Sequence, residues 1–130
     1  MTDQAIEKEI QAKGANVAPR ITPADIEANI LGTWYVTGSD GAYGAALRGV
    51  PYEQQPPVPV AHSLTLLTFC VLVLRNGFTV TGESACASPG NFNAEIGQKV
   101  ARQNAVAKIW PLMGYELKTR IEAEKTFGQG

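Results

Sequence analysis

The clearest pattern of hydrophobic and polar positions lies in the middle of the chain. A largely apolar run over residues 64–74 is followed by a run over 79–83 in which apolar and polar side chains alternate. Between them stands Asn76-Gly77, the dipeptide most typical of a type I′ hairpin turn, because both of its residues accept a positive φ. We therefore expect an antiparallel β-hairpin over residues 64–86.

This turn predicts which residues face each other across the hairpin. Leu72 and Leu74 would lie with Cys70 on a half-polar face, where another segment or subunit has to cover them. Cys70 and Cys86 would point to opposite faces, so we expect no disulfide between them. The pairs on the expected core face are Arg75 with Phe78, Val73 with Val80, Val71 with Gly82, and Phe69 with Ser84.

A helical pattern follows the hairpin. Residues 88–93 have turn chemistry, with Ser88, Asn91 and Asn93 as alternative helix caps. We expect the helix over residues 91–110, packed on the sheet through a stripe of apolar side chains. That stripe consists of Phe92, Ile96, Val100, Ala107 and Trp110, with Val106 at its edge.

The two ends of the chain have weaker patterns. Pro111 should end the helix, because proline lacks the N–H that a helix interior needs. Residues 112–117 then indicate a turn and a short final strand or helix, before a frayed tail over 122–130. Residues 1–20 are polar and predict a flexible arm that contains one short helix.

The segment between the arm and the hairpin divides into two parts. Thr22-Pro23-Ala24-Asp25 is a clear helix start, and this helix should reach Leu31, with Gly32 ending it. Residues 32–63 are rich in glycine and proline and predict a long irregular loop, with Trp34-Tyr35-Val36 as a candidate edge strand. Loops of this length bind something, pack on another subunit or are tolerated insertions, and the sequence leaves these alternatives open.

Together these elements predict a small α+β domain over residues 21–121, in which one helix covers one face of an antiparallel sheet. A chain of 130 residues, 45% of them hydrophobic, is long enough for one domain with its own core. Two cysteines and the one histidine, His62, have no recognisable zinc-ligand spacing. Nucleophile-elbow, Walker-loop and dinucleotide motifs are also absent, so we expect no catalytic residues, no metal and no cofactor.

Charge and hydropathy limit the expected partners. A net charge of −1 argues against a DNA or RNA duplex, whose binding needs clustered lysine and arginine. No apolar run reaches the ~20 residues that cross a bilayer, so we expect no membrane. Met1-Thr2-Asp3-Gln4 lacks the basic and apolar regions of a signal peptide, which favours a cytoplasmic protein.

Charge is unevenly distributed along the chain. Residues 75–120 carry six basic and three acidic side chains, whereas residues 1–74 carry four basic and seven acidic ones. A small anionic ligand is therefore expected in the hairpin and helix half, with arginine or lysine on phosphates, asparagine on ribose and an aromatic ring on a base. The candidate ligand-binding residues are Arg75, Phe78, Asn91, Asn93, Lys99, Arg102, Asn104 and Lys108.

Each of these candidates also has a purely structural interpretation. The charged residues fit an ordinary solvated helix face. Asn91 and Asn93 stand at a helix N-terminus, which attracts anions, but they equally serve as simple caps. Phe78 is also suited to packing in the core. The residue pattern alone does not choose between these interpretations.

Several consecutive motifs resemble a known family. In this order they are similar to the phage gene product 49 family, small accessory proteins of tailed phages and prophages. The resemblance covers residues 64–121, has a weaker counterpart in 21–26, and leaves 32–63 unmatched. The motifs are Val71-Leu-Val-Leu-Arg-Asn-Gly-Phe-Thr-Val-Thr-Gly-Glu-Ser-Ala-Cys86, Ser88-Pro-Gly-Asn-Phe-Asn-Ala-Glu-Ile-Gly97, Val100-Ala-Arg-Gln-Asn-Ala105 and Ile109-Trp-Pro-Leu112 with Gly114-Tyr115.

The chain further resembles the first type of anti-Thoeris sponge. These phage proteins capture cyclic ADP-ribose signals of a bacterial immune system, and some also hold cyclic oligonucleotides. The resemblance implies a homo-oligomer, a dimer or hexamer, that binds its ligand without turnover in the host cytoplasm. The alternative is an accessory factor that inhibits a host protein through residues 32–63 and the exposed sheet face, with Pro56-Pro57-Val58-Pro59 as a polyproline segment.

Overall fold

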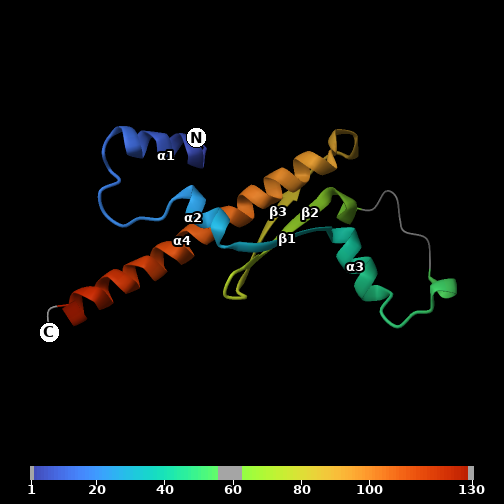
Figure 1. Ribbon diagram of the computed structural model, residues 1–130. Coiled ribbons are helices and arrows are strands. Elements are labelled where there is room, and N and C mark those ends of the chain that lie inside the picture. The colour runs from blue at the N-terminus through green and yellow to red at the C-terminus, as the bar shows by residue number, and fades with distance from the viewer. Residues whose placement is uncertain (1, 56–62, 129–130) are drawn as a thin grey trace.

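The computed structural model describes residues 2–55 and 63–128 and has the expected α+β architecture (Figure 1). Three antiparallel strands form one sheet in the order β1-β2-β3, so β2 is central. The strands are β1 (Ile30–Thr37), β2 (Leu67–Leu74) and β3 (Thr79–Ala85). The α-helices are α1 (Asp3–Ala12), α2 (Pro23–Ala28), α3 (Gly38–Ala46) and α4 (Ala94–Gly128). Short 3-10 turns lie at Tyr52–Gln54, Ser63–Leu66 and Pro89–Asn91.

Helix α4 packs against β2 and β3 through unusually small side chains. Its buried face repeats every four residues through Gly97, Ala101, Ala105 and Ile109. A Cβ added at Gly82 of β3 would lie 2.2 Å from both the Ala101 carbonyl oxygen and the Ala105 amide nitrogen. Helix and strand backbones are therefore in direct contact, which only glycine at position 82 permits.

The prediction of which α4 side chains pack on the sheet was wrong. Ile96 and Val100 are 60% and 39% exposed, and Ala107 is also exposed. Large apolar residues define a helix face on a wheel, but a close helix-to-sheet approach requires small ones, and these carry little hydrophobic signal. Phe92, Val106 and Trp110 are only half-buried, and Val106 and Trp110 pack beside the core rather than at its centre.

The hairpin is confirmed, but its predicted register is off by one residue. The Leu74 amide donates to the Phe78 carbonyl over 2.8 Å, so Arg75, Asn76 and Gly77 form a three-residue loop. Gly77 has a φ of +88°, whereas no described non-glycine residue has a positive φ, which excludes a type I′ turn. Asn-Gly suits either turn, so the dipeptide alone could not fix the register.

This shift of one residue exchanges the two faces of β2. Leu72 now pairs with Val80, and Cys70 pairs with Gly82. Cys70, Leu72 and Leu74 are therefore core residues beneath α4 and need no further cover. Both cysteines are free, as expected, although the predicted reason of opposite faces does not hold for this register.

The predicted helix 91–110 is shorter than the observed one at its C-terminal end. Helix α4 continues through Pro111 to Gly128, so neither the stop at Pro111 nor the separate element over 112–117 exists, and much of the predicted 122–130 tail is helical. A proline inside a helix removes the hydrogen bond to the carbonyl four residues earlier, here that of Ala107, and its ring crowds the same carbonyl. Ala107 is solvent-exposed, so water can satisfy that carbonyl.

The predicted loop over residues 32–63 is in large part regular structure. Trp34-Tyr35-Val36 does lie in an edge strand, but β1 spans Ile30–Thr37 and α3 follows it directly. The preceding helix accordingly ends at Ala28 rather than Leu31. A capping box starts α3, since the Thr37 hydroxyl accepts from the Asp40 amide and the Asp40 carboxylate accepts from the Thr37 amide, both over 2.9 Å. The proposed polyproline segment and His62 lie outside the described residues.

Candidate functional site

A broad cleft lies between the hairpin loop, α2 and the second half of α4. Its volume is about 510 Å³. Three arginines line it, with Asp25 and Glu116 as the acidic members. Ile21, Met113 and Leu117 supply an apolar wall. We call this the basic cleft, after Arg20, Arg75 and Arg120.

Arg75 is held in a fixed position at the edge of the basic cleft. Its Nε donates to the carbonyl of Ala28, and its backbone amide donates to the carbonyl of Asn29 over 3.0 Å. No carboxylate of the described residues forms an ion pair with it. The two terminal guanidinium nitrogens are thus oriented by the protein yet available to an anion, and guanidinium groups bind phosphate and carboxylate in a bidentate manner.

The other two arginines differ in availability. Arg120 has only a long contact of 3.9 Å to Glu116, and both side chains are more than 60% exposed, so this pair is weak. Arg20 instead donates two short hydrogen bonds, of 2.5 and 2.7 Å, to the Glu7 carboxylate of α1. This bidentate pair lowers the Glu7 pKa to about 2. In the present conformation Arg75 and Arg120 can accept an anion, whereas Arg20 is occupied.

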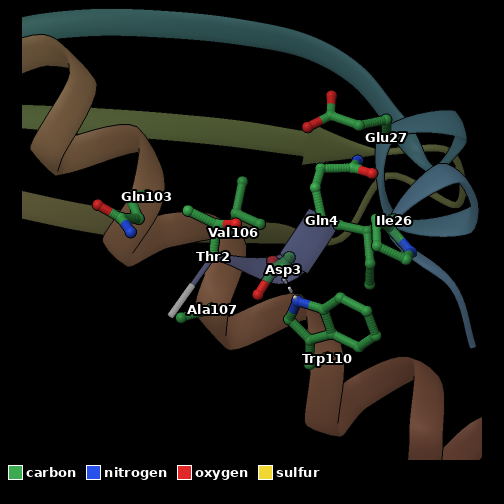
Figure 2. A pocket seen from close by; sticks show the side chains of 10 residues that line it. Thr2, Asp3, Gln4, Ile26, Glu27, Gln103, Val106, Ala107 and Trp110 are labelled. Carbon is green, nitrogen blue, oxygen red and sulfur yellow. Dashed lines mark hydrogen bonds between the residues drawn. The ribbon is translucent and has the colours of Figure 1, made fainter. Parts of the chain in front are cut away.

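Two further cavities lie beneath α1, next to α2 and α4, and Figure 2 shows the larger one. Their volumes are about 370 and 240 Å³, and both are lined by Asp3, Pro23 and Trp110. Figure 2 shows Asp3 pointing toward the Trp110 indole, whose Nε1 donates to its carboxylate over 3.1 Å. We call this region the α1 groove. Asp3 and Glu27 make it a poor site for an anion.

Of the eight predicted ligand-binding residues, only Arg75 lines one of these cavities. Arg102 bridges α4 to α2 by donating to both Glu27 carboxylate oxygens, over 3.1 and 2.9 Å. This pair lowers the pKa of Glu27. Lys99 pairs with Glu95 one turn away on the exposed surface of α4, at 3.3 Å. The structural interpretation of these two cations is therefore the better one.

The remaining candidates lie on other parts of the surface. Asn93 caps α4 by accepting from the Ile96 amide over 3.0 Å, and Asn104 donates to the Glu83 carbonyl of β3 over 2.8 Å. Phe78 is 56% exposed at the hairpin end rather than in the core. Asn91 and Lys108 are exposed and line none of these cavities. The structure does not bring these residues together with Arg75.

Sequence reasoning missed Arg20 and Arg120 as cleft residues. Arg120 was overlooked because the helix was expected to end at Pro111, nine residues earlier in the chain. Arg20 was assigned to a flexible arm, yet Ile21 beside it packs against the core. The helix-start signal at residues 22–25 could have shown that this part of the chain is fixed to the domain.

Within residues 2–55 and 63–128, no group of three or more histidine, cysteine, aspartate or glutamate side chains gathers in a way that could hold a metal ion. Within the same residues, no helix combines the length and the apolar character needed to cross a membrane.

A sequence model of the phage protein (N4 Gp49/phage Sf6 gene 66) family matches residues 21–121. The chain belongs to this family. The matched region of this phage protein contains the sheet, Arg75 and Arg120, whereas α1 and Arg20 precede it. No curated protein and no solved structure gives a significant match to the chain.

Proposed function

We propose that this phage protein binds a small anionic, nucleotide-like ligand in the basic cleft and holds it without turnover. The ligand class we favour is a cyclic nucleotide signal of bacterial immunity, either a cyclic ADP-ribose isomer or a cyclic oligonucleotide. The protein would then act in the host cytoplasm as an anti-defence sponge. The observation that carries this proposal is Arg75, whose guanidinium is fixed through Nε and has no acidic partner among the described residues.

The chemistry of the basic cleft suits capture. Arg75 and Arg120 can bind phosphate oxygens, and the apolar wall of Ile21, Met113 and Leu117 can cover a base. A volume of about 510 Å³ lies in the range of ordinary small-molecule sites. Nanomolar capture needs about −12 kcal/mol, which charge-assisted contacts and apolar burial can supply without an activated nucleophile or a tuned acid–base pair.

We further propose that the protein acts as a homo-oligomer, a dimer or hexamer. The register places Trp34, Val36, Phe69, Val71 and Val73 on the sheet face away from α4. Trp34 and Val36 are 58% and 40% exposed, and an apolar surface of this kind supports a contact with a second copy.

Native mass spectrometry of the purified chain tests the proposed function. The protein is mixed with cyclic ADP-ribose isomers and with cyclic di- and trinucleotides, and bound ligand is then released by heat. We expect one ligand class to bind stoichiometrically and to be recovered unchanged. Recovery of a cleaved ligand would overturn the sponge proposal in favour of an enzyme.

Matched arginine variants assign the site. We expect Arg75→Gln and Arg120→Gln each to weaken binding about tenfold, because each removes one charge-assisted contact. Arg48→Gln is the control, since Arg48 is exposed and does not line the basic cleft. Equal affinities for all three variants and the unmodified chain would show that the ligand binds elsewhere.

A second candidate function is inhibition of a host protein. The exposed sheet face favours it, because Trp34 and Val36 are accessible to any partner. Replacing residues 39–62 with a short glycine-serine linker discriminates the two, since none of the described residues of this stretch, 39–55, lines the basic cleft. Loss of phage protection with ligand binding intact would support the host-protein function.

A further inference from the structure

Arg20 takes part in two structural features at once. It lines the basic cleft, while its guanidinium is bound by Glu7 from α1. Both side chains of this pair are shielded, with exposed fractions of 22% for Arg20 and 13% for Glu7. The Glu7 carboxylate therefore binds the Arg20 guanidinium, which would otherwise be available to an anion in the cleft.

Helix α1 is attached to the rest of the molecule by few contacts. None of its residues is buried, and the cavities of about 370 and 240 Å³ separate part of it from α2 and α4. Besides the Glu7–Arg20 pair, the Asp3–Trp110 hydrogen bond joins it to the domain. The connecting residues 13–19 are all exposed. A helix held in this way can leave without disturbing the core.

Arg20 would remain at the basic cleft after such a release. Ile21, the next residue, packs against the hydrophobic core, and α2 begins two residues later at Pro23 with its capping box. Carboxylate and phosphate groups bind a guanidinium in the same bidentate geometry. A ligand phosphate can therefore replace the Glu7 carboxylate at Arg20.

We propose that Arg20 is a third anion-binding residue of the basic cleft and that α1 is a latch which occupies it in the free protein. Binding of an anion at Arg20 then releases α1, and docking of α1 weakens anion binding. The two effects have the same size, because coupling between two binding events is reciprocal. This inference rests on the proposed function of the cleft and adds a regulated third contact to it.

Removing the latch charge gives the direct test. Inorganic pyrophosphate serves as the probe, and its affinity is measured by calorimetry for the unmodified chain and for Glu7→Gln. We expect Glu7→Gln to bind pyrophosphate about tenfold more tightly, since Arg20 no longer has a competing carboxylate. Glu9→Gln is the matched control: Glu9 lies on the same helix but pairs with Lys13 of the same segment, at 2.7 Å.

A second variant shows whether the gain acts through Arg20. The double variant Glu7→Gln/Arg20→Gln should lose the gain and bind no more tightly than Arg20→Gln alone. Hydrogen exchange of residues 3–12 is the structural readout. Pyrophosphate should accelerate exchange in this segment of the unmodified chain and leave the exchange of the β2 amides unchanged.

The outcomes separate the latch from the cleft. Equal pyrophosphate affinity for the unmodified chain, Glu7→Gln and Glu9→Gln, with unchanged exchange in α1, would overturn the latch while the cleft proposal stands. Absence of pyrophosphate binding to every variant, with circular dichroism showing folded protein, would overturn the anion cleft and the latch with it.

Discussion

Helix α4 packs closely against the sheet but only loosely against α1. Toward the sheet, Ala101 and Ala105 bring its backbone against β3 with no space for a Cβ at Gly82. Toward α1, the same helix uses Trp110 for one hydrogen bond across a groove that contains two cavities. The comparison shows how one helix can provide both a rigid core and a releasable attachment. The contact with β3 is closely packed, whereas the contact with α1 contains cavities.

The largest effect is expected at the closest contact. Gly82→Val should abolish cooperative folding or cost more than about 3 kcal/mol, because the added carbons meet backbone atoms that cannot move independently. Urea denaturation followed by circular dichroism measures this. Gly114→Ala is the control, since its Cβ meets nothing within 4 Å and alanine favours a helix by about 1 kcal/mol. Similar unfolding midpoints for both variants would contradict the tight contact.

Truncating an apolar side chain should cost much more stability at the contact between α4 and the sheet than in α1. Ile109→Ala should lower the free energy of unfolding by about 3 kcal/mol, because Ile109 is fully buried against the sheet. Ile6→Ala in α1 should change it by less than about 0.5 kcal/mol, since Ile6 is 40% exposed. The same urea titration compares them, and a cost at Ile6 approaching that at Ile109 would show that α1 belongs to the core.

The Arg102–Glu27 ion pair should contribute less to the free energy of unfolding than Ile109 does, and this contribution should be present only above acidic pH. Its side chains are 33% and 56% exposed, so Glu27→Gln should cost about 0.5 kcal/mol at pH 7. Arg102 lowers the Glu27 pKa in the folded protein, so this contribution is present above the ordinary glutamate pKa of about 4.5 and is lost as the pH falls below it. Unfolding titrations of both proteins at pH 7 and at successively lower pH test this, and a stability difference that does not decline as the pH falls below about 4.5 would refute the assignment.

The smallest change in overall stability is expected at the α1 attachment. Trp110→Phe removes the indole donor to Asp3 but keeps an aromatic ring beside the core. Global unfolding should shift by less than about 0.5 kcal/mol, while hydrogen exchange in residues 3–12 should accelerate about fivefold. Trp34→Phe on the open sheet face is the control. Unchanged exchange in α1 would show that this hydrogen bond does not hold the helix.

The predicted elements were most accurate where a local signal has one meaning. Thr22-Pro23 started a helix as expected. The cap of α4, by contrast, was left open among Ser88, Asn91 and Asn93, and the structure uses Asn93. The Asn76-Gly77 signal was ambiguous, because a two-residue turn and a three-residue loop with glycine at positive φ both accept it. That single residue of difference decided which face of β2 became the core.

The candidate site was less predictable than the fold. Arg75 was selected from the hairpin tip and does line the basic cleft. Arg20 and Arg120 are a hundred residues apart in the chain, and only the packing of α2 and α4 places them on the same cleft. Arg102, by contrast, had the right charge but is paired with Glu27. A charge count cannot distinguish an available cation from a paired one.

The sequence by itself determined the α+β class, the hairpin, the helix after it and the family, because these depend on local periodicity, turn residues and motif order. Tertiary structure alone decided the register, the buried face of α4 and the membership of the basic cleft. The physical reason is that each depends on how side chains and backbone of different segments meet. The loop that Asn76-Gly77 adopts sets the register, the small side chains of α4 permit its approach to β3, and the packing of α2 and α4 brings the arginines together.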